Sequence, residues 1–150
     1  MASLLGTQTY AIDHKGRIAI PASLRRRDGS KPITSFILKE GFDGCLALYP
    51  TEEWTRVEQR LRRIPMGTRE GRRFQRAFLM NVVPVSVDSQ GRITVPPALL
   101  SRAGLGKEAV LHGQVDHIEI WNPERLEAEL RDAMAQDQIS ILAEQVLKDE

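Results

Sequence analysis

One short motif occurs twice in this chain and limits what it can fold into. The run Asp13-His14-Lys15-Gly16-Arg17 recurs 75 positions later as Asp88-Ser89-Gln90-Gly91-Arg92. Each copy continues with alternating apolar residues and a proline, Ile18-Ala19-Ile20-Pro21 in the first and Ile93-Thr94-Val95-Pro96 in the second. A fixed Asp-x-x-Gly-Arg pattern with the same continuation indicates an internal duplication. We therefore expect two related structural units.

The motif itself predicts a tight hairpin. Asp at its first position and Gly at its fourth suit a type I turn closed by a residue with positive φ, and the Arg then begins the return strand. The Asp carboxylate can accept hydrogen bonds from turn amides and can face the Arg across the hairpin. Two interpretations remain open. The pair can be a surface ion pair that stiffens the turn, worth about 0 to 1 kcal/mol, or it can orient a guanidinium for a ligand, which the retention of the pair in both copies favours.

The two halves also share an order of predicted elements around the hairpins. In the first half we expect a helix over 21–27, strands over 34–39 and 45–49, a helix from Thr51 as N-cap, and a second helix from about Thr68. The helix that begins at Thr51 has an apolar stripe that we predict to be core, made of Trp54, Val57, Leu61 and Ile64. In the second half we expect strands over 82–88, 92–95, 109–112 and 118–121, a helix over 96–102, and an amphipathic helix over 138–147.

This order predicts a mainly β fold with helices, of the α+β class. Two β-β-α-β-β modules are expected to pack as a pseudo-twofold pair within one chain, because each can bury the face that the other cannot cover alone. The predicted boundaries are a first module at 7–55, a helical linker at 56–81, a second module at 83–126 and a helical tail at 127–150.

Composition indicates an ordinary soluble protein. Of 150 residues, 41% are hydrophobic and 27% charged, as in globular domains. Neither an apolar run long enough for a membrane span nor a leader-like start is visible, so we expect a cytoplasmic protein without membrane contact. Cys45, the only cysteine, lies in an apolar run and is expected to be a buried small hydrophobe.

The formal net charge of +1 is the sum of a basic first half and an acidic second half. Residues 1–76 contain 15 Lys or Arg and 8 Asp or Glu, whereas residues 77–150 contain 6 and 12. This distribution suggests an anionic partner for the first half, or complementary contacts between subunits. The arginines between Arg56 and Arg76 can form a solvated or subunit-facing helix surface, or contact DNA.

Little in the sequence supports catalysis. The three histidines, His14, His112 and His117, are scattered, and neither a metal-ligand spacing nor a glycine-rich phosphate loop is visible. We therefore expect no enzymatic activity, no cofactor, no metal and no small-molecule substrate. A small barrel hydrolase using Asp13 or Asp88 as a base is the least favoured alternative.

Several separated motifs resemble the MraZ family of bacterial transcriptional regulators. They are the two hairpin motifs, Asp43-Gly44-Cys45-Leu46, Tyr49-Pro50 with Glu53-Trp54, Ala103-Gly104-Leu105, and Ile120-Trp121. The resemblance implies tandem SpoVT-AbrB modules forming a swapped-hairpin β-barrel, assembly into ring-like oligomers, and binding to short direct repeats upstream of a division and cell-wall gene cluster that includes the regulator's own gene. The family usually begins Met-Phe-x-Gly, whereas here Gly6 follows Leu5.

The two hairpins differ in charge, and we expect them to differ in role. The first carries Lys15 and Arg17, whereas the second has neutral Ser89 and Gln90 beside Arg92. The first is therefore predicted to read DNA. Its predicted DNA-binding residues are Arg17, toward base edges or phosphate, with Lys15 and His14 flanking it, and Asp13 and Gly16 as the resemblance implies. The predicted structural or auxiliary residues of the second are Asp88, Gly91 and Arg92.

The predicted function follows from these assignments. We expect a sequence-specific, nucleoid-associated DNA-binding regulator, a repressor of its own operon, that binds double-stranded promoter DNA as a homo-oligomer larger than a dimer. The main alternative is an antitoxin-like module whose principal partner is another protein.

Overall fold

The computed structural model describes residues 3–26 and 31–148 of the chain. Within these residues the strands are β1 (Thr7–Ala11), β2 (Arg17–Ala19), β3 (Ser35–Glu40), β4 (Leu46–Pro50), β5 (Val83–Ser86), β6 (Arg92–Thr94), β7 (Glu108–Gly113) and β8 (Ile118–Trp121). The helices are α1 (Thr51–Leu61), α2 (Arg69–Leu79), α3 (Pro97–Arg102), α4 (Pro123–Ala135) and α5 (Gln138–Leu147), with one 3-10 turn at Ala22–Leu24. The chain has the predicted α+β class.

The two repeats exchange their first strands. The main sheet has the order β1-β7-β8-β4-β3-β5, and every pairing in it is antiparallel. β1 of the first repeat therefore pairs with β7 of the second, and β5 of the second repeat pairs with β3 of the first. If each strand is replaced by its counterpart in the other repeat, the same order results in reverse. The predicted pseudo-twofold, swapped-hairpin arrangement is confirmed.

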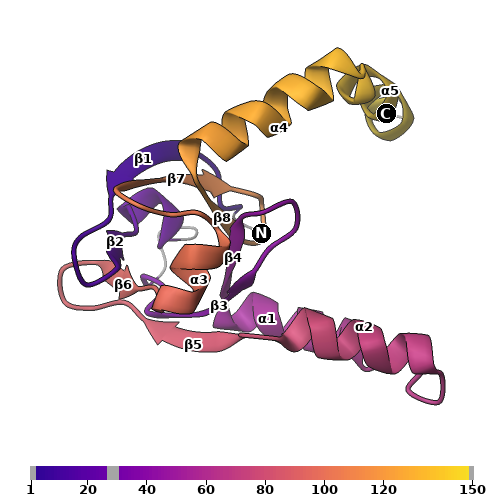
Figure 1. Ribbon diagram of the computed structural model, residues 1–150, viewed down its shortest axis with the longest axis horizontal. Helices are drawn as coiled ribbons and strands as arrows, with labels where there is room; N and C mark the ends of the chain where they lie inside the picture. Colours follow the sequence, from indigo (N-terminus) through magenta and orange to yellow (C-terminus); the bar gives the residue numbers. More distant parts are fainter. Residues whose placement is uncertain (1–2, 27–30, 149–150) are drawn as a thin grey trace.

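A two-stranded ribbon closes this sheet into a barrel-like unit. β2 and β6 pair antiparallel, with Ile18 opposite Ile93. Each ribbon strand follows an edge strand of the main sheet through a hairpin, β1 into β2 and β5 into β6, so the ribbon joins the two edges (Figure 1). The ribbon thus contains one strand from each repeat and begins at both Asp-x-x-Gly-Arg turns.

The core lies between this ribbon and the sheet. Ile18 and Ile93 are fully buried and belong to one continuous apolar cluster with Phe36, Leu48 and Leu111, drawn from both repeats. Burial of a side chain of this size stabilises the fold by about 1.5 to 3 kcal/mol. Neither repeat could shield this cluster from water alone, because its members come from both repeats. The ribbon that carries the repeated turn motif is therefore fixed to the core by its inward side chains.

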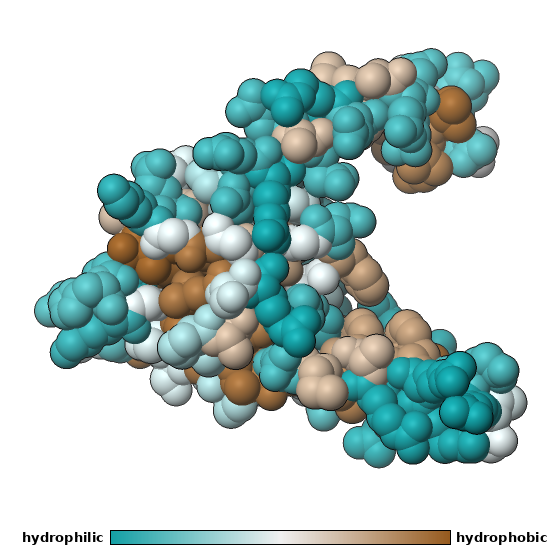
Figure 2. All heavy atoms as spheres, viewed as in Figure 1, coloured by the Kyte–Doolittle hydropathy of each residue, from teal (hydrophilic) through white to brown (hydrophobic). Residues whose placement is uncertain are grey.

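Two helical arms project from the same side of the barrel. α1 and α2 form one arm and α4 and α5 the other, at corresponding places in the two repeats (Figure 1). In space-filling view the end of the α2 arm is largely hydrophilic, whereas apolar side chains gather on the end of the α5 arm (Figure 2). Within the described residues, none of the helices has the length and apolar character needed to cross a membrane.

Three local predictions for the first repeat were wrong or incomplete. The helix expected over 21–27 is only the 3-10 turn Ala22–Leu24, and its end beyond Arg26 lies outside the described residues. Thr51 is the first residue of α1 and not its cap, because its hydroxyl donates to the Ser35 carbonyl.

The α1 stripe is less buried than predicted, since it projects on an arm. Only Trp54 is buried, stacked with Phe78 of α2 at a centroid distance of 6.4 Å, and the other three stripe residues are half-buried. Beside this contact, Lys39 Nζ lies 4.1 Å from the Phe78 ring centroid. Burial lowers the pKa of Lys39, as expected where a cation leaves water.

The cysteine prediction is confirmed. Cys45 is buried, and its thiol donates to the Phe42 carbonyl over 3.2 Å. Burial raises the pKa of this thiol to about 12, so it stays protonated at neutral pH and is a poor nucleophile.

Candidate nucleic-acid interface

Both motifs fold as the predicted three-residue hairpin. In the first, the Gly16 amide donates to the Asp13 carbonyl over 3.0 Å, and Gly16 has φ of 77°. In the second, the Gly91 amide donates to the Asp88 carbonyl over 3.0 Å, and Gly91 has φ of 79°. This left-handed conformation is accessible to glycine without the steric cost that a Cβ atom brings. The motif's fourth position is therefore fixed by backbone geometry.

The Asp13 side chain organises the first hairpin. Its Oδ1 accepts from the amides of Lys15 and Arg17 at 2.9 and 2.8 Å, and its Oδ2 accepts from Arg17 Nε at 2.5 Å. The pKa of Asp13 is lowered to about 2, and the largest cause is the hydrogen bond from the Arg17 amide. Desolvation opposes this shift, and the hydrogen bond from the Arg17 guanidinium lowers the pKa further. Asp13 is therefore ionised at all physiological pH values and holds Arg17 in one orientation.

Asp88 plays the same part in the second hairpin. Its Oδ1 accepts from the amides of Gln90 and Arg92 at 2.8 and 2.9 Å, and its Oδ2 accepts from Arg92 Nε at 3.0 Å. Its pKa is likewise lowered, chiefly by the Arg92 amide. The duplication thus preserves the hydrogen-bond pattern as well as the sequence.

Strand alternation places both arginines on the outer face of the ribbon. Ile18 and Ile93 point into the core with no exposed surface, and neighbouring residues of a strand point the opposite way. Arg17 precedes Ile18 and Arg92 precedes Ile93, and each arginine side chain is 27% exposed. A guanidinium from each repeat is therefore presented to solvent from one short ribbon.

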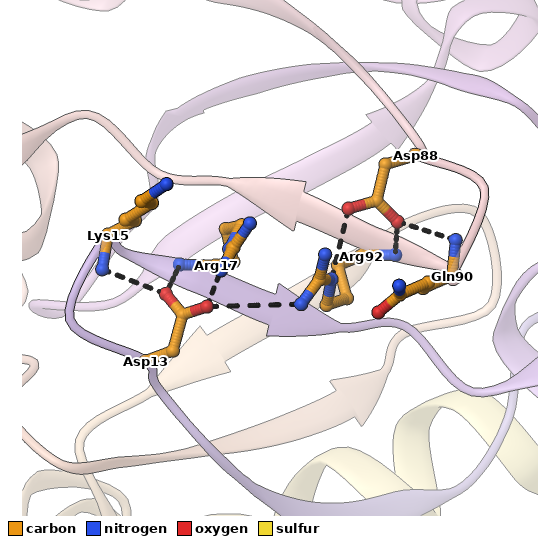
Figure 3. Close-up of polar contacts among 6 residues, drawn as sticks. All are labelled: Asp13, Lys15, Arg17, Asp88, Gln90 and Arg92. Atoms are coloured by element: carbon orange, nitrogen blue, oxygen red, sulfur yellow. Dashed lines mark hydrogen bonds and ion pairs between the residues drawn. The ribbon is translucent and has the colours of Figure 1, made fainter.

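The two Asp-Arg pairs meet across the ribbon. Figure 3 shows the two arginines lying between the two aspartates. Arg92 Nη1 lies 4.0 Å from Asp13 Oδ2, a contact between repeats. The two terminal nitrogens of Arg17 have no such partner among the described residues. Arg17 is therefore the more available of the two guanidinium groups.

The remaining predicted residues of the first hairpin lie at its tip. His14 and Lys15 are exposed and flank the turn, whereas Gly16 is buried against the other repeat. The Val95 amide donates to the Gly16 carbonyl over 2.9 Å, and the Ile20 amide donates to the Gly91 carbonyl over 2.8 Å. Each hairpin is thus held by the strand that follows the other hairpin.

One basic residue near the site was not predicted. Arg25, just after the 3-10 turn, donates from Nε to the Ile20 carbonyl over 2.6 Å, and its guanidinium lies against Gly91 at the second hairpin. The corresponding residue of the second repeat, Leu100, lies against Gly16. The repeat offset of 75 positions identifies Arg25 and Leu100 as equivalent residues from sequence alone. The contact of Arg25 with the hairpin of the other repeat, however, depends on the strand exchange.

The other candidate residues lie apart from this ribbon. His112 Nδ1 is 2.8 Å from the Thr7 hydroxyl, between β7 and β1. His117 stacks on Tyr49 at a centroid distance of 4.7 Å. Among the described residues we find no cluster of three or more His, Cys, Asp or Glu side chains that could hold a metal ion.

Comparison with known proteins fits this geometry. The model of the family described as "MraZ protein, putative antitoxin-like" matches residues 3–77 and again residues 78–148. The two matches divide the chain between the repeats that the structure interlocks.

Curated relatives cover most of the chain. A protein of Heliobacterium modesticaldum is 42% identical over 121 residues, which is 81% of this chain and 82% of the relative. A protein of Lachnoclostridium phytofermentans is 40% identical over 130 residues, 87% of this chain and 89% of the relative. Both are named "Transcriptional regulator MraZ", a class of protein that is not enzymatic. With two family matches and relatives at this identity and coverage, the chain belongs to the MraZ family.

Proposed function

We propose that this protein is a sequence-specific DNA-binding transcriptional regulator that reads promoter DNA with the first hairpin. The family relatives are named transcriptional regulators, which supports DNA as the ligand. The two hairpins lead into a two-stranded β-ribbon, an element that the major groove of DNA admits. Arg17 is the residue that contacts base edges.

This assignment rests on the hydrogen bonding of the Arg17 guanidinium. Asp13 accepts from its Nε at 2.5 Å, which restrains the orientation of the group. The two terminal nitrogens have no hydrogen-bond or ion-pair partner among the described residues, and these are the donors that pair with O6 and N7 of guanine. A side chain held in advance loses less conformational entropy on binding than a free one. Lys15 and His14 lie beside it and flank the same contact.

The second hairpin is less suited to reading bases. Arg92 is held by Asp88 in the same manner, but one of its terminal nitrogens is drawn toward Asp13 at 4.0 Å. Its turn offers the neutral Ser89 and Gln90 where the first offers His14 and Lys15. We assign Asp88, Gly91 and Arg92 an auxiliary role, which supports binding without reading bases.

The regulator is proposed to repress its own operon through short direct repeats in the promoter. A single hairpin covers only a few base pairs, so recognition of repeated sites needs several copies of the ribbon at fixed spacing. The protein therefore acts at the nucleoid as a homo-oligomer larger than a dimer. Binding of several ribbons together adds avidity without new contacts.

The two helical arms supply surfaces for this assembly. Residues 51–79, the basic arm, contain 8 Arg and 4 Glu, whereas residues 123–148, the acidic arm, contain 3 Lys or Arg and 6 Asp or Glu. The acidic arm exposes apolar side chains, among them Met134 at 71%, Leu142 at 57% and Val146 at 69%. Near the basic arm, Phe42, Phe74 and Phe78 line a pocket of about 200 Å³.

We propose that the acidic arm of one chain docks on the basic arm of a second copy. Opposite charge and apolar side chains on both surfaces favour this partner. The contact joins different surfaces of the two copies, and such heterologous contacts close into rings when the rotation allows.

The DNA-binding function is tested by an electrophoretic shift assay on the promoter region of the chain's own operon. A duplex of the same composition and scrambled order is the control. We expect a preference for the promoter duplex and a steep loss of affinity from low to physiological salt, because several Lys and Arg residues displace counterions. Equal affinity for both duplexes, or a flat salt response, would overturn the proposal.

A further inference from the structure

The two hairpins differ in charge within their own sequences, but the fold compensates for the difference. Residues 13–17 contain one acidic and two basic residues, whereas residues 88–92 contain one of each. The second hairpin therefore lacks the positive charge that Lys15 gives the first. Gln90 occupies the position equivalent to Lys15.

Strand exchange brings a cation from the first repeat to the second hairpin. A Cβ atom built on Gly91 would lie 3.1 Å from Arg25 Nη2 and 3.3 Å from its Cζ, so the guanidinium lies directly on the turn. Arg25 Nε is anchored to the Ile20 carbonyl over 2.6 Å. With Arg25 included, the second hairpin has the same net charge as the first.

The reciprocal position shows that packing alone does not require an arginine. At the first hairpin the equivalent place is occupied by Leu100, and a Cβ atom built on Gly16 would lie 3.2 Å from its Cδ1. One hairpin thus has its lysine in the turn and a leucine behind it, whereas the other has a glutamine in the turn and an arginine behind it. The charge is conserved between the two sites although its source differs.

The terminal nitrogens of Arg25 are the donors that could bind a further ligand. The Ile20 carbonyl occupies Nε, and the part of the chain that the structure describes gives its two terminal nitrogens no hydrogen-bond or ion-pair partner. The side chain is half-buried, so it retains access to solvent. A guanidinium fixed at one nitrogen, whose other two nitrogens have no partner within residues 3–26 and 31–148, suits a phosphate oxygen.

We propose that Arg25 completes the second hairpin as a binding element for DNA backbone phosphate, so that both hairpins of one chain contact the same duplex. The first hairpin reads bases, and the second, through Arg25 and Arg92, positions the ribbon on the backbone. Phosphate contacts fix register and carry no sequence information. The inference rests on the proposed function, since it requires the ribbon to bind duplex DNA.

The test uses Arg25→Leu, which installs the residue found at the equivalent place in the other repeat. Fluorescence anisotropy is measured on the promoter duplex and the scrambled duplex over a series of salt concentrations. We expect a similar several-fold loss of affinity on both duplexes, and a log-log salt slope reduced by about 0.9 for each Arg25 that contacts phosphate. A matched control is Arg102→Leu, which removes the same charge from the exposed Glu40–Arg102 pair between β3 and α3 and should leave the slope unchanged.

Rescue separates a charge role from a packing role. Arg25→Leu combined with Gln90→Lys returns the cation to the turn position that Lys15 occupies in the first hairpin. The double variant should recover the salt slope and most of the affinity. If Arg25→Leu lowers the melting temperature, Arg25→Met takes its place, because its unbranched chain follows the same path as that of arginine.

The outcomes distinguish this inference from the proposed function. A wild-type protein without preference for the promoter duplex overturns both. A wild type that binds as proposed, with a neutral Arg25 variant whose slope and affinity are unchanged, overturns the role of Arg25 alone. A loss that Gln90→Lys fails to rescue assigns Arg25 to packing and likewise overturns it.

Discussion

Arg92 Nη1 of the second repeat lies 4.0 Å from Asp13 Oδ2 of the first, so one carboxylate is approached by the arginines of both repeats. The same carboxylate accepts from Arg17 Nε at 2.5 Å. Asp13 therefore links the two turns, whereas Asp88 bonds only within its own hairpin among the described residues. The pseudo-twofold axis is broken at this point, and the break makes the two hairpins experimentally separable.

Replacing Asp13 should raise the affinity for any duplex and lower the preference for the promoter sequence. Asp13→Asn removes a negative charge from the ribbon, so binding to any duplex should strengthen at low salt. It also weakens the hold on Arg17, so the ratio of promoter to scrambled affinity should fall, by up to the 1 to 3 kcal/mol, roughly 5- to 150-fold, of one bidentate base contact. Competition titrations measure this ratio. Asp88→Asn is the matched control and should change it much less, and an equal fall in both variants would contradict the asymmetry.

Acid should destabilise the hairpins in a defined pH window. The pKa of Asp13 in the folded protein is about 2, below the ordinary value of 3.8 for this side chain, so the folded state binds fewer protons than the unfolded state between these values. The stability from this group is complete above about pH 4 and is lost as the pH falls through about 2. Urea unfolding midpoints of wild type and Asp13→Asn, measured from neutral pH downward, should converge at the acid end. A constant difference would show that the ionised carboxylate adds no stability.

The two hairpin glycines should differ in their tolerance of alanine. Both have positive φ, so both substitutions cost about 1 kcal/mol in backbone strain. At Gly16 the new Cβ would also lie 2.8 Å from the Val95 carbonyl oxygen, whereas at Gly91 it meets the end of the Arg25 side chain at 3.1 Å. Backbone cannot move as easily as a side-chain end, so Gly16→Ala should lower the melting temperature more than Gly91→Ala. The opposite order in calorimetric scans would argue against this packing.

Assembly should depend on the apolar face of α5. Leu142→Glu places a charge on the proposed contact and should shift the protein toward smaller species in light scattering. Ser140→Glu adds the same charge to an exposed polar position of the same helix and should leave the mass unchanged. High salt should also favour smaller species, because screening weakens contacts between the basic and acidic arms. A wild-type monomer at micromolar concentration and low salt would refute the proposed assembly.

Local patterns predicted the turns and most strands, but they could not predict contacts made by strand exchange. The hairpins follow from Asp and Gly, whose preferences are set within five residues. The helix expected over 21–27 is only a 3-10 turn in its described part, where Leu24 is drawn fully into the shared core. The contact of Arg25 with Gly91 joins residues 66 positions apart, and no local rule indicates it. Sequence therefore located Arg17 in the candidate site and missed Arg25.

The central claim, that Arg17 reads bases while Arg92 does not, is tested most directly by one paired titration. Wild type, Arg17→Ala and Arg92→Ala are each titrated against the promoter and scrambled duplexes at physiological salt, with thermal melts as a check on folding. Arg17→Ala should abolish the preference for the promoter duplex, and Arg92→Ala should retain it with a modest loss of affinity on both duplexes. Equal loss of preference in both variants, with unchanged melts, would contradict the division of labour between the two repeats.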